Sequence, residues 1–459
     1  MKTKTVVTFL LVGLMVALSA DITEKSKAET PADLAYRDPD LAPDVRAQTV
    51  VRQMTLEEKK RLVVGHQKFF IAPMERFGLR AIYLTDASAG MHIRGDLFAM
   101  EKSIAYPSTV ALAATWEPEL ARKYGAAIGA ECRAWGADVL LGPGVNLYRN
   151  SECGRNFEYM GEDPLLVGKM ATAHVQGVQS QGIMATAKHF IANNHEWQRH
   201  ATDVRIGERP LNELYGRAWY RMIDEGGLGA VMTAYNLVNG EKASQSKALI
   251  EDFLRDEIGF DGLVMSDWNG VWDMHKAIYS GLDLIMPHGE MIDPRGEEVA
   301  FEEALNRMCA NILTACFRFG YYDREAKDPS FMADYPAFEQ VALKTARRSI
   351  TLLKNEERTL PLEQSSLRNV LVTGPAALAT PHAGKGSGAV EGYDHTHIFS
   401  ELQRVLGESR VAFIESPTDK QLKAADAVVV CANTNDSEGF VSPFALDPEQ
   451  EALIQRTVR

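Results

Sequence analysis

The sequence predicts an α/β fold in which a (β/α)8-type TIM barrel is followed by a partial α/β sandwich. Short continuous apolar runs alternate with amphipathic helical patterns up to about residue 325. This alternation is typical of a parallel sheet that is covered by helices. Beyond residue 322 a polar, proline-bearing stretch precedes a second and shorter set of apolar runs, which indicates a second domain.

Six apolar runs of strand length end in polar or turn-forming residues. They cover residues 81–85, 137–141, 183–187, 230–234, 263–265 and 283–286. Continuous apolar character, without alternation, is expected of strands that are buried on both faces. A doubly wound open sheet is the alternative, but it normally carries a glycine-rich phosphate turn after its first strand, and residues 86–90 are not such a turn.

Helical patterns lie between these runs. Residues 209–225 have a proline near their start, apolar positions on one face and two glycines at their end, as expected for a helix with clear boundaries. In residues 116–135 the apolar face repeats every four positions, at Leu120, Tyr124, Ile128 and Cys132.

The second domain is shorter than the first. Its clearest predicted strands are residues 369–373 and 427–432, and the sequence stops inside a helical pattern that starts at residue 447. We therefore expect this domain to be incomplete. The predicted segments are a signal peptide (1–20), the barrel (21–325), a linker and helix (326–348) and the α/β sandwich (349–459).

The N-terminus has the pattern of a secretory signal. Lys2 and Lys4 form a basic start, residues 6–17 are almost wholly apolar, and small residues precede Asp21. The apolar run is shorter than the roughly 20 residues that a stable membrane-spanning helix needs. We therefore expect a secreted or periplasmic protein with no membrane span in its mature form.

Composition and net charge limit the kinds of molecule that the protein is expected to bind. The chain has 459 residues, of which 46% are hydrophobic, enough for a large core. A net charge of −13 argues against nucleic acid or an anionic membrane as the main partner and favours a small molecule. The five cysteines are irregularly spaced and imply no disulfide framework, and Cys309 and Cys316 are placed to share one buried face of a helix.

The most informative segment is residues 262–268, where a short apolar run ends in Asp267 and Trp268. In a parallel α/β barrel this is the position at which catalytic groups are found. A carboxylate there serves as nucleophile or base, and the indole can pack on an apolar face of a substrate. The alternative interpretation is that Asp267 caps the following helix.

Other predicted strands also end in polar residues. Asp86, Lys188, His189 and Tyr235 follow or close apolar runs, as Asp267 does. Because the carboxyl ends of parallel strands meet at one rim of a barrel, we expect these side chains to form one site. A carboxylate near Lys188 would stay ionised, as a nucleophile must.

Two further loops carry charged groups. Residues 149–159 include Arg155, and residues 435–440 place Glu438 after the strand at 427–432. Taken alone, the first is best interpreted as a surface ion-pair network and the second as an ordinary acidic loop.

Neither a metal nor a cofactor is predicted. The histidines of residues 195–200 are five apart, so a helix would not place both on one face, as the zinc motif H-E-x-x-H requires. The glycine-rich residues 384–388 lack the spacing of a phosphate-binding loop, and a flexible loop is the favoured interpretation.

From about Met54 to its end the chain resembles glycoside hydrolase family 3, the β-glucosidase and β-xylosidase group. The resemblance rests on several motifs that occur together and in the same order as in the family. The matching segments are residues 153–159 with 162–164, 188–190 with Asn194 and Glu196, 235–236 with 239–240, 265–268 and 352–355.

The resemblance implies a barrel and an α/β sandwich with the active site between them. It implies that Asp267 is the nucleophile and Glu438 the general acid/base, and that Trp268 lines the cleft. The family's sugar-contacting arginine after Asp86 is matched by either His92 or Arg94. The other residues implied to hold the sugar are Asp86, Arg155, Lys188, His189, Arg199 and Tyr235.

The implied reaction is hydrolysis of an oligosaccharide or an aryl or alkyl β-glycoside with retention, which requires about 5–5.5 Å between the two carboxyl groups. Lys188 and Arg155 are expected to lower the pKa of Asp267, and a dry site to raise that of Glu438. Two alternatives stay open: a sugar-binding barrel with weak or no activity because its second domain is truncated, and a lyase-type barrel with Lys188 as a Schiff base. The choice between glucoside and xyloside is also open.

Overall fold

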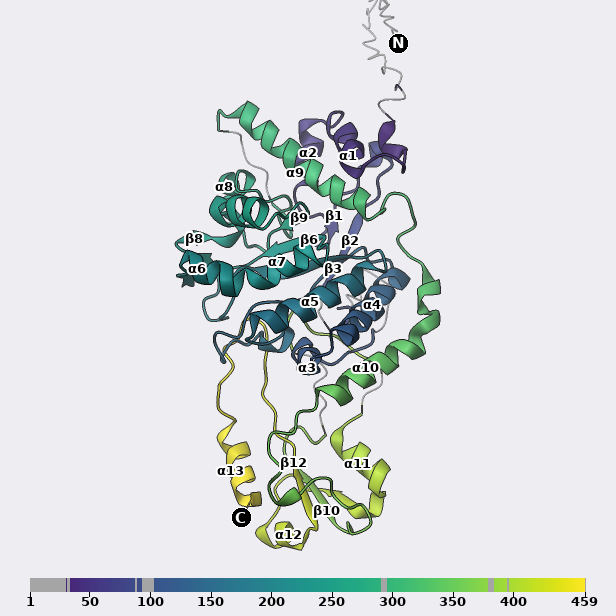
Figure 1. The fold of residues 1–459 in the computed structure, drawn as a ribbon, viewed down its shortest axis with the longest axis vertical. Helices are drawn as coiled ribbons and strands as arrows, with labels where there is room; N and C mark the ends of the chain where they lie inside the picture. Colours follow the sequence, from purple (N-terminus) through teal and green to yellow (C-terminus); the bar gives the residue numbers. More distant parts are fainter. Residues whose placement is uncertain are drawn as a thin grey trace, which may run out of the picture.

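The computed structural model describes residues 30, 34–86, 89–92, 103–289, 295–378, 384–393 and 396–458. A larger body holds the N-terminal part of this chain, and a smaller body lies below it in Figure 1. The proposed signal peptide and Arg94 fall outside the described residues. Within the described ranges, no helix is both long and apolar enough to span a bilayer.

The larger body is a TIM-barrel-like domain, as the sequence predicts. Its sheet has the order β1-β2-β3-β4-β6-β9, and all neighbours are parallel except β1 and β2. The strands are β1 (Phe70–Ile71), β2 (Ile82–Asp86), β3 (Val139–Leu141), β4 (Met184–Phe190), β6 (Ala230–Thr233) and β9 (Leu263–Met265). Three bridges close the ring: Met265 with Leu284, Ile285 with Val64, and His66 with Phe70.

The ring departs from an all-parallel barrel at β1. The chain turns back on itself between His66 and Phe70, whose backbones exchange hydrogen bonds of 2.7 and 2.9 Å. Gln67 and Lys68 at the turn have φ of 44° and 71°, the left-handed backbone that such tight turns need. The next strand, β1, therefore runs antiparallel to β2.

Helices cover the barrel (Figure 1). The predicted helix at 116–135 is confirmed as α4, which begins at Pro118 and ends before Gly136, a glycine with φ of 90°. The predicted helix at 209–225 is instead divided into α6, a π-helical turn at Leu211–Tyr215, and α7. The helices are α1 (Pro43–Val51), α2 (Leu56–Leu62), α3 (Thr109–Ala114), α4 (Pro118–Trp135), α5 (Pro164–Gln179), α6 (Glu208–Pro210), α7 (Arg217–Asp224), a π-helix (Ala248–Glu257), α8 (Met274–Ile278) and α9 (Glu298–Arg318).

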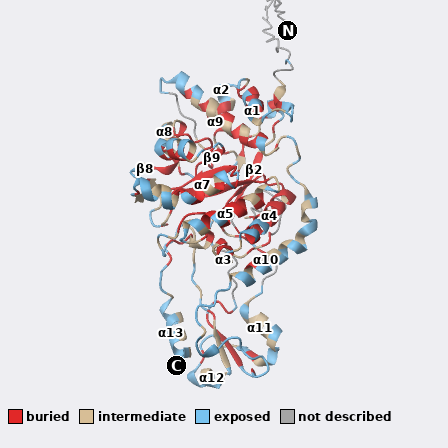
Figure 2. Ribbon diagram, in the orientation of Figure 1, coloured by how far each residue is buried: buried red, intermediate tan, exposed pale blue. Residues whose placement is uncertain are grey.

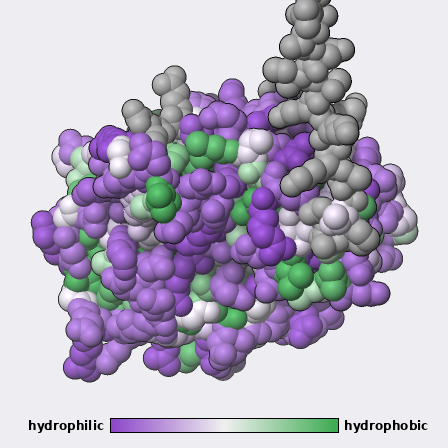
Figure 3. Space-filling model, turned by 90° about the horizontal axis from the view of Figure 1, so that it is seen from above, coloured by the Kyte–Doolittle hydropathy of each residue, from purple (hydrophilic) through white to green (hydrophobic). Residues whose placement is uncertain are grey.

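The core of the barrel domain is extensive. Figure 2 shows buried residues concentrated in its sheet and on the inner faces of its helices, and they form one continuous hydrophobic cluster. Figure 3 shows the end turned away from the second body, where hydrophilic side chains predominate. All five cysteines are free and buried, and Cys309 and Cys316 share the buried face of α9, as predicted.

The second body is an α/β domain on a small parallel sheet of order β11-β10-β12. Helix α10 (Tyr335–Ser349) leads to it along the side of the barrel domain. Its own hydrophobic cluster is small. Its elements are β10 (Val370–Thr373), β11 (Val411–Phe413), β12 (Ala427–Val430), α11 (Ile398–Leu406), α12 (Asp419–Ala424) and α13 (Pro448–Val458).

A separate three-stranded sheet lies outside the barrel ring. It has the order β5-β7-β8, with β5 (Asp203–Val204), β7 (Leu237–Val238) and β8 (Glu241–Lys242). Strand β5 follows the loop after β4, and β7 follows the loop after β6. This sheet therefore joins two of the loops that extend from the barrel strands.

The remaining short 3-10 turns are Ala35–Arg37, Glu75–Phe77, Asn156–Glu158, Ala243–Gln245, Pro329–Asp334, Glu356–Arg358 and Glu408–Arg410.

Candidate active site

A pocket of about 450 Å³ lies between the ends of the barrel strands and two loops of the second domain. Extended segments connect the second domain to the barrel in Figure 1. Every predicted site residue that belongs to the described part of the chain lines this pocket: Asp86, Arg155, Lys188, His189, Arg199, Tyr235, Asp267, Trp268 and Glu438. Of the two candidates after Asp86, His92 lines the pocket, and Arg94 lies outside the described residues.

Asp267 lies two residues beyond the end of β9 and is 6% exposed. Trp268 N donates to its Oδ1 at 2.6 Å, and His189 Nε2 lies 3.5 Å from its Oδ2. Asp267 is not a helix cap. The cap of α8 is Asp273, whose side chain accepts from Lys276 N at 3.2 Å. The interpretation of Asp267 as a capping residue is therefore wrong.

Burial sets the acidity of Asp267. Removal from water raises its pKa, Arg155 and Lys188 lower it, and the nearby Glu438 carboxylate raises it; together these effects bring the pKa of Asp267 to about 6. The two cations act in the predicted direction, but their effect is smaller than that of burial. The expected lowering by Lys188 and Arg155 is therefore confirmed, while the net pKa of Asp267 is raised because burial dominates.

The raised pKa of Asp267 predicts the pH below which activity is lost, the acid limb of the pH profile. If Asp267 must be ionised to attack, kcat/KM for an aryl β-glycoside should rise as the pH passes through about 6, because the protonated carboxyl below that pH is not a nucleophile. Initial rates at low substrate concentration between pH 4 and 8 measure this limb. A limb at the pH of an unperturbed aspartate, near 4, would contradict the assignment.

Glu438 is held by cations from the barrel. Arg199 Nη1 donates to its Oε1 at 2.8 Å, Arg155 Nη1 lies 3.5 Å from the same oxygen, and Ser387 N donates to Oε2 at 2.8 Å. Burial raises the pKa of Glu438, but Arg155, Ser387 and Arg199 together lower it well below its usual range. The predicted raised pKa of Glu438 is thus wrong, because two arginines and Ser387 outweigh the dry surroundings.

Residues 149–159 are not a surface ion-pair network. Arg155 is buried beneath the pocket, where its Nε donates to Glu158 and its Nη1 faces Glu438. The loop also pairs with residues 437–442 of the second domain. The backbone contacts are a bridge between Cys153 and Val441, Gly154 N to Phe440 O at 3.2 Å and Ser442 N to Glu152 O at 2.9 Å.

A carboxylate of the barrel completes this attachment. Glu196 Oε2 accepts from Gly439 N at 2.7 Å and from Arg199 Nη1 at 2.8 Å. The residue next to Glu438 is therefore fixed by the barrel itself. The position of Glu438 therefore depends on barrel loops together with residues 385–387 of its own domain, where Lys385 O accepts from Glu438 N at 3.3 Å and Ser387 N donates to its Oε2.

Gly154 offers a test of this attachment. A β-carbon at this position would overlap the carbonyl oxygens of Ser437 and Phe440, so Gly154→Ala should push the Glu438 loop away. We expect kcat to fall about 10- to 100-fold, because a shift of about 1 Å in a catalytic group has effects of that size. The matched control is Gly207→Ala, where a β-carbon meets nothing closer than 3.9 Å. Equal kcat values for the two variants would contradict the proposed attachment.

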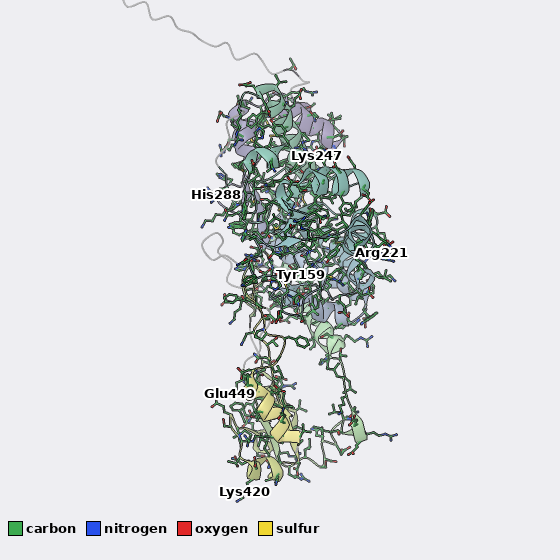
Figure 4. All side chains as sticks on the ribbon, turned by 90° about the vertical axis from the view of Figure 1, so that its left-hand side faces the viewer. Tyr159, Arg221, Lys247, His288, Lys420 and Glu449 are labelled. Carbon is green, nitrogen blue, oxygen red and sulfur yellow. The ribbon has the colours of Figure 1, made fainter. Side chains whose placement is uncertain are left out.

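Other groups line the sugar-sized space. Lys188 Nζ lies 3.7 Å from Asp86 Oδ1 and forms an ion pair with it. Burial and the neighbouring cations Arg155, Lys188 and Arg199 lower the pKa of His189 well below its usual value, so its ring is neutral. Tyr159, labelled in Figure 4 inside the barrel domain, contacts His189 Nδ1 through its hydroxyl at 3.2 Å.

The glycine-rich loop at residues 384–388, interpreted from the sequence as a flexible loop, borders the pocket. Ser387 and Gly386 line the pocket. A β-carbon on Gly386 would lie 2.5 Å from Glu438 Cβ, so only glycine fits beside the carboxylate. His92 Nδ1 lies 3.1 Å from Ser387 O and links this loop to the barrel. The only sequence feature that could have indicated a role for this loop in the site is its run of alternating glycines at residues 384–388.

Four further lining residues were not predicted from the sequence to belong to the site. They are Lys68, Phe69, Leu141 and Met232. Phe69 lies against Trp268, with ring centroids 4.5 Å apart and an interplanar angle of 30°, so the two rings form one apolar wall. Among the described residues, no group of three or more His, Cys, Asp or Glu side chains is arranged to hold a metal ion.

Comparisons with known proteins agree with this architecture. Residues 50–293 match the Glycosyl hydrolase family 3 N terminal domain, and residues 350–459 match the Glycosyl hydrolase family 3 C-terminal domain. The chain is 34% identical over 437 residues to the thermostable beta-glucosidase B of Acetivibrio thermocellus, covering 88% of this chain and 57% of that protein. It is 37% identical over 349 residues to a beta-glucosidase of Rhizobium radiobacter, covering 74% of this chain and 42% of that protein.

A solved structure shows the same fold. Beta-glucosidase 3B from Thermotoga neapolitana, in complex with glucose, aligns with a TM-score of 0.79 and 31% sequence identity, covering 90% of this chain and 66% of that chain. The matches thus include both domains, and this chain spans about half the length of the two curated relatives described above.

Proposed function

The chain belongs to glycosyl hydrolase family 3, and from that premise we propose that it is an exported, retaining β-glycosidase. Its substrate is an oligosaccharide or an aryl or alkyl β-glycoside, from which it removes a terminal non-reducing β-D-glucosyl or β-D-xylosyl residue. The observation that carries the proposal is the convergence of two carboxylates, the buried Asp267 and the partly buried Glu438, on one pocket with Asp86, Lys188 and Arg155. Export is proposed on the N-terminal secretory pattern alone.

In the first step an Asp267 carboxylate oxygen attacks the anomeric carbon. The bond from that carbon to the leaving oxygen breaks, and the leaving oxygen takes the proton of Glu438. In the second step Glu438 takes a proton from water, the water oxygen attacks the anomeric carbon, and the bond to Asp267 breaks. Two displacements restore the original configuration, with the carboxyl groups about 5–5.5 Å apart in the complex.

Of the two carboxyls Asp267 has the higher pKa, because burial raises it, whereas Arg155, Ser387 and Arg199 lower the pKa of Glu438. Catalysis needs the opposite order, with Glu438 the weaker acid. Sugar hydroxyls that donate hydrogen bonds to Asp267 favour its ionised form. The leaving oxygen beside Glu438 favours the protonated form of that residue. Substrate binding thus reverses the order of the two pKa values, so that Glu438 is the carboxyl that carries the proton.

The proposal is tested by following hydrolysis of 4-nitrophenyl β-D-glucoside and β-D-xyloside by proton NMR. Retention requires the β-anomer of the free sugar to appear first, before mutarotation produces the α-anomer. Appearance of the α-anomer first would contradict the two-step mechanism. A folded protein that binds glucose without turnover of either substrate would instead support the alternative of an inactive sugar-binding barrel.

A further inference from the structure

A buried lysine lies behind the pocket and is used by none of the steps above. Lys242 is on β8, opposite Leu237 of β7, and is 3% exposed. Within the described part of the chain, no carboxylate pairs with its ammonium group. Isolated charges are expensive to bury, so a lysine retained at such a position calls for a reason beyond packing.

The ammonium group has three neighbours instead. Its Nζ donates to His200 O at 2.5 Å and to Tyr235 O at 2.7 Å, and it lies 3.6 Å from the ring centroid of Trp272. A cation over an indole face is attracted by the ring quadrupole. One side chain therefore connects the main chain of the loop after β4 to that of the loop after β6.

Both connected residues border groups of the pocket. The Tyr235 ring is packed between the Arg199 guanidinium, 4.2 Å from its centroid, and the His200 ring, 4.4 Å from it. Arg199 in turn donates to Glu438 Oε1 at 2.8 Å. A shift of either carbonyl group would therefore move Tyr235 and Arg199 relative to each other, and with them the hydrogen bond on Glu438.

We propose that Lys242 is a positioning residue for the pocket, which ties Tyr235 to the loop that carries Arg199 and so fixes the arginine that holds Glu438. The inference rests on the proposed glycosidase function and deepens it. Lys242 does not line the pocket, so it acts through these neighbours and not on the sugar.

The charge of Lys242 gives the role a pH dependence. Burial lowers its pKa to about 8, so the ammonium form is lost as the pH rises through that value. The titratable residues in contact with its Nζ are His200 and Tyr235, whose main-chain carbonyls accept from it. Burial and the charge of Lys242 lower the pKa of His200. The neighbouring Glu241 is paired with Lys276 of α8 at 3.4 Å. An arginine at position 242 would keep its charge throughout this range.

The test compares kcat and KM for 4-nitrophenyl β-D-glucoside in wild type, Lys242→Met and Lys242→Arg between pH 6 and 9. The control is Lys276→Met, an exposed lysine that contacts the same strand through Glu241. At pH 6.5 we expect Lys242→Met to lower kcat about 10- to 100-fold with a smaller change in KM. Lys242→Arg should restore kcat to within about threefold of wild type, and Lys276→Met should leave it unchanged.

The decisive readout is the ratio of the Lys242→Arg rate to the wild-type rate, in which the titration of Asp267 and Glu438 cancels. This ratio should rise as the pH passes 8. Three results would overturn the role of Lys242. They are a rate ratio that does not change with pH, a kcat of Lys242→Met equal to that of wild type, and an equal loss of kcat in Lys242→Met and Lys242→Arg. The ratio decides the matter even if Lys242→Met does not fold. A wild type without turnover would overturn the proposed function and this role with it, whereas an active wild type with any of the three contrary results overturns the role alone.

Discussion

Replacement of Asp267 by asparagine is expected to lower kcat for an aryl β-glucoside by about 10³- to 10⁵-fold, the range seen when a unit of covalent catalysis is removed. The amide has nearly the same size and keeps an oxygen to accept from Trp268 N, so folding should be little affected. What is lost is the negative charge that attacks the anomeric carbon. The measurement is steady-state turnover, together with the melting temperature of each variant.

Asp273 provides a matched control from the same loop. It caps α8 by accepting from Lys276 N, so Asp273→Asn should change stability by no more than about 1 kcal/mol and leave kcat near the wild-type value. Similar losses of kcat in both variants would show that the loop, and not the carboxylate of Asp267, supports activity. Full activity in Asp267→Asn would remove the nucleophile assignment altogether.

A rescue experiment separates a nucleophile from a carboxylate that merely stabilises charge. In Asp267→Gly, azide can enter the vacated space and attack the anomeric carbon from the face that Asp267 occupied. The aglycone leaves with the proton of Glu438, so a single displacement yields an α-glycosyl azide. Recovery of a β-glycosyl azide would contradict this geometry, because a single displacement at that face inverts the configuration.

Much of the site was predictable because strand direction is readable from the sequence. Asp86, Lys188, Tyr235 and Asp267 follow runs of apolar residues, and parallel strands bring the residues after such runs to one rim. The barrel followed by an α/β domain was predictable for the same reason. The reversed β1 was not, because it depends on a tight turn at residues 67–68 whose composition shows no turn preference.

The electrostatics of the site could not be predicted in this way. The pKa of Glu438 depends on Arg155 and Arg199, which approach from loops more than two hundred residues earlier in the chain. Whether burial or these cations dominates is a question of distances that local sequence does not contain. Ser387 and Lys242 illustrate the same point: each acts through partners that only the folded chain brings within hydrogen-bonding distance.

Replacement of Glu438 by alanine should produce a loss that depends on the leaving group. Substrates whose aglycone needs a proton should lose about 10²- to 10⁴-fold in kcat/KM, the usual contribution of general acid catalysis. A 2,4-dinitrophenyl glucoside, whose phenolate departs without a proton, should form the glycosyl-enzyme at a nearly unchanged rate and then accumulate it. The measurement is a series of aryl glucosides of differing leaving-group acidity, with a pre-steady-state burst for the most acidic member.

Azide distinguishes this carboxyl from Asp267. With Glu438 removed, azide needs no general base and attacks the accumulated glycosyl-enzyme, so the product is a β-glycosyl azide, the opposite anomer to that expected from Asp267→Gly. Glu449→Ala, at an exposed position of α13 in the same domain (Figure 4), is the control and should behave as wild type. If Glu438→Ala lost kcat/KM equally for all leaving groups, the general acid would be a residue other than Glu438. The predicted pattern would instead show that contacts from Arg199, Glu196 and Gly154 are sufficient to hold a catalytic Glu438 against the barrel.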